Sequence, residues 1–380
     1  MTGAPALLVL EDGTVFRGTG FGAEGEAVGE VVFNTGMAGY QEVLTDPSYA
    51  GQIVVMTAPH QGNYGVNEED AESDRIHVAG FAVRESSRRA SSWRAEGTLD
   101  AALAAAGVPG IEGIDTRKLT RRIREVGAMR ACVSSVDLDP DSLLDRVRAA
   151  PRMAGADLAH TVTTPAAYEA AAVVGPADRS QGRVFRVVAY DFGIKRSILS
   201  GLAARGIEAT VVPASTPAVD VASGDVDGVL LSNGPGDPAA TADGVAAAAG
   251  LLGRVPLFGI CLGHQLLALA LGGRTYKMPF GHRGVNQPVR EEGSGAVRIT
   301  SHNHGFAVDP DGWPRDRHGA ARSPAGPVEI THRNLNDGTV EGLRCRDIPA
   351  FSVQFHPEAA PGPHDANALF DEFRSLMASA

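Results

Sequence analysis

The sequence has 380 residues, of which 43% are hydrophobic and 21% are charged. This composition is typical of a soluble globular protein and excludes a disordered or collagen-like chain, and the length predicts two domains or three. Acidic residues outnumber basic ones by 45 to 34, which gives a formal charge of −11. Because an acidic surface repels phosphate backbones, we expect no nucleic-acid partner.

Residues 1–150 mix short strands with helices. Two apolar runs flank Glu11-Asp12-Gly13, and an Asp-Gly pair supplies the positive φ that a tight hairpin turn needs. Further strands are predicted at 30–34, 53–57 and 77–84, and helices at 99–106, 115–126 and 141–149. Asp115 is a typical N-cap residue for the second helix. Strands followed by helices predict an N-terminal α+β domain.

Residues 151–183 show little periodicity and are predicted to connect two domains. From residue 184 to residue 380 strands and helices alternate, which predicts an α/β domain with a doubly wound, mostly parallel sheet. The predicted strands are 184–190, 208–212, 226–231 and 256–260, and the predicted helices are 195–204, 239–252 and 264–271. Hairpin strands are predicted at 297–300, 328–331, 339–345 and 350–355, before a final helix at 365–377.

The strongest chemical signal is Gly-Ile-Cys-Leu-Gly-His-Gln at residues 259–265, between a predicted buried strand and a predicted helix. It has the Gly-x-nucleophile-x-Gly layout of a nucleophile elbow, with Cys261 in the place of the serine. The glycines are needed because the turn is sharp and side chains there would collide with neighbouring strands. The helix N-terminus that follows favours a thiolate and can stabilise an oxyanion. The alternative is an inert, buried cysteine at a strand end.

A thiolate nucleophile needs an imidazole, and His356 is the best placed of the 11 histidines. It follows a predicted strand, and Pro357 keeps its backbone extended. In an extended chain residues two apart share a side, so Glu358 is positioned to orient His356 as a triad requires. The alternative is a solvated histidine at a strand end beside a loop glutamate.

Three other patterns are weaker indications of a functional site. Residues 232–238 (Ser-Asn-Gly-Pro-Gly-Asp-Pro) end a predicted strand, and their glycines let backbone N–H groups approach an oxyanion, although an ordinary Pro-Gly turn has the same letters. His282, His302 and His304 suggest metal ligands, but no carboxylate or cysteine spacing supports them, and we expect no metal site. One predicted helix carries a basic stripe, either a solvated face or an interface contact, formed by Arg117, Lys118, Arg121, Arg122 and Arg124.

The elbow, the 232–238 loop and the terminal His-Pro-Glu together resemble the class I, triad-type glutamine amidotransferases. The first half is similar to the N-terminal domain of the carbamoyl-phosphate synthetase small subunits. This second resemblance rests on residues 33–42, 44–49, 62–65 and 114–120, and on 303–308 in the second half. Together the two resemblances cover nearly the whole chain.

The resemblance implies a role for each matched residue. Cys261 would attack the glutamine carboxamide, His356 would act as acid and then base, and Glu358 would hold His356. Backbone N–H groups of Gly236 and Leu262 would form the oxyanion hole. The residues implied to bind glutamine are Ser48, Gly234, Gly236, Leu262, Gln265, Asn303, Gly305 and Phe306.

The resemblance also implies a partner, because free ammonia becomes protonated in water and loses its nucleophilicity. The receiver would be a large synthetase subunit, forming a heterodimer or a higher assembly, that uses ATP and Mg to make carbamoyl phosphate from bicarbonate. This chain itself would need no cofactor. The product serves arginine and pyrimidine biosynthesis in such families.

Three alternatives remain open on the sequence. The chain could serve another synthase, of the anthranilate or GMP type, but the first 150 residues favour carbamoyl phosphate. It could be a stand-alone cysteine hydrolase, but in α/β-hydrolases the acid precedes the histidine, whereas Glu358 follows His356. It could be a non-catalytic subunit that keeps the fold. A missing nucleophile would favour that alternative, but Cys261 is present.

The location is predicted from what the sequence lacks. No apolar run approaches the roughly 18 residues of a membrane span, and residues 1–5 do not begin a signal peptide. Cys132, Cys261 and Cys345 are too few for a disulfide framework and include no Cys-x-x-Cys pair. We therefore expect a reduced, cytoplasmic protein without membrane association.

Overall fold

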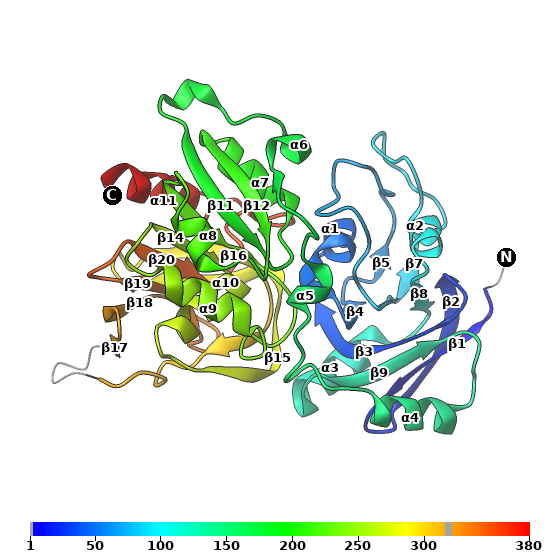
Figure 1. Cartoon of the computed structure of the whole chain (residues 1–380). Coiled ribbons are helices and arrows are strands. Elements are labelled where there is room, and N and C mark those ends of the chain that lie inside the picture. Colours follow the sequence, from blue (N-terminus) through cyan, green and yellow to red (C-terminus); the bar gives the residue numbers. More distant parts are fainter. Residues whose placement is uncertain (1–2, 316–320) are drawn as a thin grey trace. The chain divides into compact units, whose positions relative to one another are not determined.

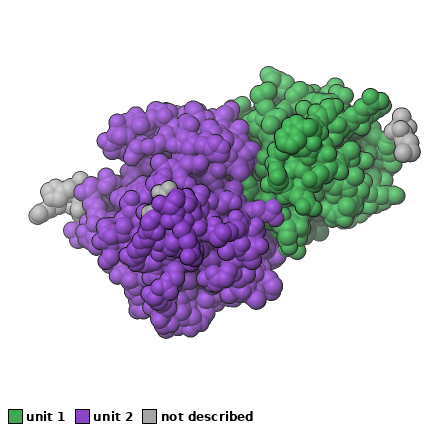
Figure 2. Space-filling view, turned by 90° about the horizontal axis from the view of Figure 1, so that it is seen from above, with its two compact units in different colours: residues 1–156, 279–284 green, residues 157–278, 285–380 purple. Residues whose placement is uncertain are grey.

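The computed structural model describes residues 3–315 and 321–380 (Figure 1). Met1 and Thr2, part of the segment searched for a signal peptide, lie outside the described residues. The chain forms two compact units, coloured separately in Figure 2: unit 1 comprises Met1–Ala156 and Pro279–Gly284, and unit 2 comprises Asp157–Met278 and Val285–Ala380. Most of the expected connection, residues 157–183, therefore clusters with the second unit.

Unit 1 is built on a closed barrel with the strand order β1-β2-β8-β6-β4-β3-β9. The barrel strands are β1 (Pro5–Leu10), β2 (Val15–Gly22), β3 (Glu26–Asn34), β4 (Gln52–Met56), β6 (Gly80–Ala82), β8 (Pro109–Glu112) and β9 (Met129–Ser134). The predicted hairpin is confirmed: β1 and β2 are antiparallel with Leu8 opposite Phe16, and Gly13 has a φ of 85°. The sequence prediction missed β8 and β9, without which the barrel cannot close.

The barrel interior is filled by one apolar cluster that draws on every barrel strand. Along β4 the side chains alternate, so that Ile53 and Val55 join this cluster while Val54 and Met56 join a second one. Leu119 and Ile123 of helix α3 complete the first cluster. The remaining elements of unit 1 are α1 (Tyr40–Thr45), η1 (Pro47–Tyr49), β5 (His60–Gln61), β7 (Glu85–Ser86), α2 (Leu99–Ala105), α3 (Thr116–Val126) and α4 (Pro140–Ala149).

Helix α3 begins where the sequence predicted it. The Asp115 carboxylate accepts a hydrogen bond from the Lys118 N–H at 2.9 Å, which satisfies one of the amide groups that a helix N-terminus leaves without a partner. Its apolar side packs into the barrel, and its arginines and its lysine remain on the outer side. The predicted helix and its N-cap are confirmed.

Unit 2 contains an 11-stranded sheet with the order β10-β12-β11-β13-β14-β20-β19-β18-β15-β16, and β17 pairs with β18. The parallel centre consists of β11 (Phe185–Asp191), β12 (Ile207–Pro213), β13 (Gly228–Leu231), β14 (Leu257–Ile260) and β20 (Ala350–Val353). The flanking strands are β10 (Tyr168–Glu169), β15 (Thr275–Glu291), β16 (Val297–Val308), β17 (Ala321–Ser323), β18 (Gly326–Asn334) and β19 (Val340–Cys345). The long strand β15, which also carries residues 279–284 of unit 1, was not predicted.

Helices cover both faces of the parallel strands. Along β11, Val188 and Tyr190 join one apolar cluster, and Val187 and Ala189 join the other. The first cluster includes residues of α9 (Ala242–Leu251) and α10 (Leu262–Ala270), and the second includes residues of α7 (Arg196–Ala203) and α11 (Ala368–Ser379). The predicted doubly wound architecture is confirmed. The shorter helices are α5 (Ala159–Val162), α6 (Ala171–Val174), η2 (Arg179–Gln181) and α8 (Ala218–Ala222).

This topology gathers four chain segments at one edge of the sheet. Strands β11, β13, β14 and β20 are parallel, so their carboxyl ends lie together, which is where open α/β sheets bind ligands. The segments that leave these ends carry Lys195, the 232–238 loop, Cys261 and His356.

Candidate active site

Cys261 lies in a strained turn between β14 and α10. Its backbone has a φ of 55° and a ψ of −102°, a region that residues other than glycine rarely adopt. A Cβ on Gly263 would lie 2.0 Å from the Leu231 carbonyl oxygen, and one on Gly259 would lie 2.6 Å from the carbonyl oxygen of Gly263. The structure therefore has the geometry of a nucleophile elbow. The predicted collision with a neighbouring strand holds for Gly263, whereas Gly259 is constrained by the turn itself.

His356 and Glu358 follow β20 and face each other. The His356 Nδ1 lies 2.5 Å from Glu358 Oε1, and the His356 N–H donates to the Ser301 carbonyl at 2.8 Å. Cys261 and His356 are each 2% exposed, and the Glu358 carboxylate is fully buried. The structure thus brings the three residues of the expected triad into one buried cluster at the carboxyl edge of the sheet.

The electrostatics of this cluster favour an imidazolium beside a carboxylate. Burial alone would lower the pKa of His356, but the charge of Glu358 and the interaction with Cys261 outweigh burial and raise that pKa. Burial alone would raise the pKa of Glu358, but Lys195 and His356 outweigh it and lower that pKa. A charged imidazole can stabilise a neighbouring thiolate and can donate a proton to a leaving group.

Lys195 belongs to this cluster, and the sequence interpretation missed it. It is 3% exposed, and its Nζ lies 3.0 Å from Glu358 Oε1 and donates to the Ala360 carbonyl at 2.6 Å. A buried ammonium is expensive unless it is paired, so the lysine and Glu358 support each other. One signal could have found it: Lys195 closely follows a predicted parallel strand, at the same edge as Cys261.

Strand β16 and helix α10 bring most of the expected glutamine-binding residues beside Cys261. The Cys261 Sγ lies 3.5 Å from the Asn303 carbonyl oxygen. The Gln265 Nε2 donates to the Phe306 carbonyl at 2.8 Å and to Gln354 Oε1 at 2.9 Å. Gly305 lies between Asn303 and Phe306 on the same strand. The side-chain nitrogen of Gln265 is therefore held by two acceptors, which fixes the orientation of this amide.

The 232–238 loop packs against the elbow. The Gly263 N–H donates to the Ser232 carbonyl at 2.9 Å, and a Cβ on Gly234 would lie 2.2 Å from the Phe192 carbonyl oxygen. Gly236 has a φ of 95°. Within residues 3–315 and 321–380, no atom accepts a hydrogen bond from the N–H of Gly236 or of Leu262. Both amides can therefore serve an oxyanion.

Ser48 is the expected binding residue that belongs to unit 1. It lies in η1, and its N–H donates to the Asp46 carboxylate at 2.8 Å, which holds the turn after helix α1. Its side chain is buried. Its contribution to glutamine binding stays a prediction.

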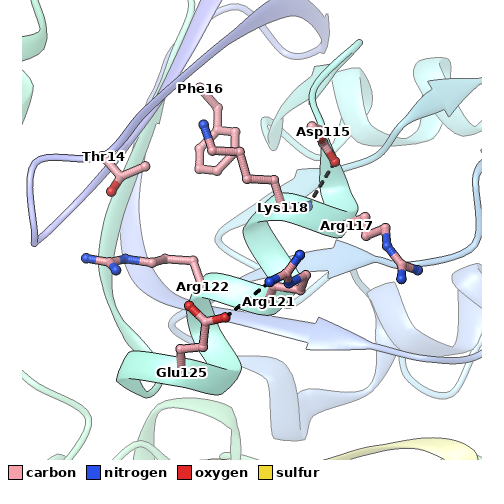
Figure 3. Close-up of a pocket in the computed structure, with 8 residues that line it drawn as sticks. All are labelled: Thr14, Phe16, Asp115, Arg117, Lys118, Arg121, Arg122 and Glu125. Carbon is pink, nitrogen blue, oxygen red and sulfur yellow. Dashed lines mark hydrogen bonds and ion pairs between the residues drawn. The ribbon is translucent and has the colours of Figure 1, made fainter.

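Four residues of the basic stripe of α3 border a cavity of about 590 Å³ in unit 1, namely Arg117, Lys118, Arg121 and Arg122 (Figure 3). Arg122 pairs with Asp12 at 2.7 Å, Arg121 lies 3.7 Å from Glu125, and the Lys118 ammonium lies 5.8 Å from the centre of the Phe16 ring. These contacts are those of a solvated, locally paired helix face. The solvated face and the interface contact both stay predictions for this stripe.

Comparison with known proteins agrees with this site. The family model for the glutamine amidotransferase class I matches residues 188–376, and the model for the carbamoyl-phosphate synthase small chain, CPSase domain, matches residues 8–133. The fold and the site thus define a class I glutamine amidotransferase with an additional N-terminal domain. Among the described residues, no helix is long and apolar enough to cross a membrane.

Proteins that are similar over nearly the full length of this chain identify the family more closely. The carbamoyl phosphate synthase small chain of Syntrophotalea carbinolica is 54% identical over 379 residues, which cover 98% of this chain and 97% of that protein. Those of Streptomyces coelicolor and Thermotoga maritima are 53% and 52% identical over 376 and 393 residues, covering 98% of this chain and 96% and 98% of theirs. The chain belongs to the carbamoyl-phosphate synthase small chain family.

Proposed function

We propose that Cys261 is the nucleophile with which this glutamine amidotransferase hydrolyses L-glutamine to glutamate and ammonia. The observation that carries the proposal is the buried cluster of Cys261, His356 and Glu358 at the carboxyl edge of a parallel sheet. The enzyme feeds this ammonia to the large subunit of carbamoyl-phosphate synthase.

The reaction proceeds through a thioester. The Cys261 thiolate attacks the carboxamide carbon, and the carbonyl oxygen becomes an oxyanion that accepts hydrogen bonds from the N–H groups of Leu262 and Gly236. When the intermediate collapses, the C–N bond breaks and the charged His356 gives its proton to the departing nitrogen, which leaves as ammonia. The neutral imidazole then takes a proton from water, which attacks the thioester and releases glutamate and the thiolate.

The other residues position this chemistry. The Glu358 carboxylate holds the His356 imidazole at its Nδ1 atom, and Lys195 keeps the Glu358 carboxylate charged. Gln265, Asn303, Gly305 and Phe306 lie on the segments beside Cys261 and, with Gly234, form the glutamine site of unit 2. The role of Ser48, which belongs to unit 1, stays a prediction.

The ammonia that this chain releases requires a partner subunit that uses it. Ammonia must reach its acceptor before it is protonated, so we infer a heterodimer with the large subunit, within which ammonia is passed on without release. The partner holds the ATP and Mg and acts on bicarbonate, and this chain needs no cofactor for hydrolysis. The complex works in the cytoplasm.

Two rival functions are less well supported. An amidotransferase subunit of another synthase would not carry the small-chain domain that matches residues 8–133. A stand-alone cysteine hydrolase of the α/β-hydrolase type would place its acid before the histidine in the chain, whereas Glu358 follows His356.

The test is covalent labelling with a chloromethyl ketone analogue of glutamine, followed by mass spectrometry. Cys132 and Cys345 are internal controls, since burial raises the pKa of their thiols to about 12 and about 11 and leaves almost no thiolate at neutral pH. We expect modification of Cys261, protection by glutamine, and labelling at least about tenfold slower in His356→Ala. Labelling of all three cysteines, or labelling that glutamine does not slow, would refute the proposal.

A further inference from the structure

A glutamine side chain is buried without charge just behind the catalytic histidine. Strand β20 ends at Val353, and Gln354 follows it, two residues before His356. Its neighbours Val353 and Phe355 belong to an apolar cluster, but Gln354 itself is polar and 0% exposed. Burial of an amide is unfavourable unless the amide forms hydrogen bonds, so the partner of Gln354 indicates what the residue does.

That partner is Gln265, one of the residues expected to bind glutamine. The Gln265 Nε2 carries two protons, of which one goes to the Phe306 carbonyl at 2.8 Å and the other to Gln354 Oε1 at 2.9 Å. A backbone carbonyl can only accept, so the nitrogen of the Gln265 amide, and not its oxygen, must face Phe306. In the part of the chain that the structure describes, no group donates to the remaining atom, Gln265 Oε1.

This amide lies at the distance from the nucleophile that a glutamine molecule spans. The Asn303 carbonyl contacts the Cys261 sulfur, and the Phe306 carbonyl contacts the Gln265 amide. The two carbonyls are three residues apart on strand β16, which corresponds to about 10 Å. In an extended glutamine the α-nitrogen is about 5 Å from the carboxamide carbon, and a contact of about 3 Å at each end makes about 11 Å. A substrate whose carboxamide meets Cys261 therefore brings its amino-acid end to Gln265.

We propose that Gln354 is a positioning residue of the glutamine site. Together with the Phe306 carbonyl it holds the Gln265 amide so that a carbonyl oxygen is presented to the substrate. Such an oxygen attracts the α-ammonium group of glutamine and repels its α-carboxylate. This role rests on the proposed function, because it concerns how the same site recognises its substrate.

Removal of the Gln354 oxygen would leave one N–H of Gln265 buried without an acceptor. The amide would then be held by one contact instead of two, and its oxygen would no longer be fixed. Glutamine should bind about 10–100-fold less tightly as a result. Glutaramate, the analogue in which hydrogen replaces the α-ammonium group, should lose little, since it never used that oxygen. A general change in packing would weaken both ligands alike.

The experiment measures by calorimetry how tightly the full chain with Cys261→Ala, which cannot form the thioester, binds glutamine and glutaramate. We expect this chain to prefer glutamine by at least about a hundredfold. Gln354→Met keeps the length of the side chain but not the acceptor and should reduce this preference at least about tenfold. Gln354→Glu keeps an acceptor oxygen and should restore the preference to within about threefold. Gln287→Met changes a partly exposed glutamine and is the matched control.

Kinetics of the chain with Cys261 intact give a second readout, in which Gln354→Met should raise KM at least about tenfold and change kcat by less than about threefold. An unchanged preference in folded Gln354→Met would overturn the proposal. Equal binding of glutamine and glutaramate in the Cys261→Ala chain would also overturn it, and that result needs no variant at position 354. Failure of the proposed function would appear separately, as a Cys261 that escapes labelling while ligand binding can still be measured.

Discussion

At the scale of single residues, opposite charges in a dry environment organise the active site. Lys195, Glu358 and His356 form a buried group in which one carboxylate oxygen, Glu358 Oε1, contacts both the ammonium and the imidazole. Each group taken alone would be costly to bury as an ion, and the alternation of charge offsets that cost only while all three are present. The protonation state of His356 therefore depends on a lysine that never needs to touch the substrate.

Replacing that lysine should move the pH dependence of glutamine hydrolysis. In Lys195→Met the largest influence that lowers the Glu358 pKa is lost, so this pKa rises and the acidic limb of the kcat/KM profile shifts to higher pH. The fold should lose about 3–5 kcal/mol, because a buried carboxylate loses its partner. A pH series of initial rates measures the shift, with the exposed Lys118→Met as the control. An unchanged acidic limb would contradict this role for Lys195.

The same charges make the stability of the fold depend on pH. The raised His356 pKa contributes stability that is complete below the unfolded value of 6.5 and is lost as the pH rises towards about 10. The lowered Glu358 pKa contributes stability that is complete above 4.5 and is lost as the pH falls towards about 2. The difference in denaturation midpoint between wild type and Glu358→Gln should therefore be largest between pH 4.5 and 6.5.

That difference is measured by urea titrations across the pH range. Glu329→Gln, which changes an exposed carboxylate, provides the matched control and should give a small difference that varies little with pH. A Glu358→Gln difference that keeps growing above pH 6.5 would show that His356 is not held as an imidazolium.

At the scale of elements, the elbow works because strand β13 and helix α10 approach without side chains between them. The Gly263 backbone rests on Leu231, and its N–H donates to Ser232. This contact fixes the first turn of α10 beside the 232–238 loop. The two N–H groups proposed for the oxyanion hole, those of Leu262 and Gly236, come from these same two segments.

Gly263→Ala should therefore damage both the fold and the activity. The added Cβ would lie 2.0 Å from a backbone oxygen that cannot rotate away, so strand and helix must separate. We expect a loss of about 3 kcal/mol or more in the free energy of unfolding and a larger loss in kcat than in glutamine affinity. Gly293→Ala, with no atom within 4 Å of its new Cβ, is the control for chemical denaturation and steady-state kinetics. Full activity in folded Gly263→Ala would argue against this function of the elbow.

At the scale of the whole molecule, the chain divides into a unit with the triad and a unit with the small-chain domain. The amidotransferase half could serve many synthases, because its chemistry ends when ammonia is released. The match over residues 8–133 is what ties that ammonia to carbamoyl phosphate.

Because this chain only supplies ammonia, the complex should also work with ammonia added from outside. In a complex with its large subunit, Cys261→Ser should lose carbamoyl phosphate synthesis from glutamine by at least about a thousandfold, because the thiolate is the nucleophile. Synthesis from added ammonium salts at pH values near 9 should stay within about twofold of wild type. Assays of carbamoyl phosphate with each nitrogen donor measure both rates. A parallel loss of both would mean that Cys261 acts on the assembly and not on glutamine.

The sequence by itself determined the features that depend on neighbours along the chain. The Asp12-Gly13 turn, the Asp115 cap and the glycines around Cys261 each meet a local demand of backbone geometry, and the structure contains all three. The alternation of apolar strands and helices after residue 184 likewise specified a parallel sheet, because a strand buried on both faces needs apolar residues throughout.

Only the tertiary structure decided which distant residues meet. Lys195 and Glu358 are 163 positions apart, and the residues next to either one do not predict that the two side chains pair. Closure of the barrel by β8 and β9 and the approach of Glu341 to His302 depend in the same way on which strands become neighbours. Sheet pairing joins segments through backbone hydrogen bonds that carry little sequence information, so these contacts emerge only when the whole chain packs.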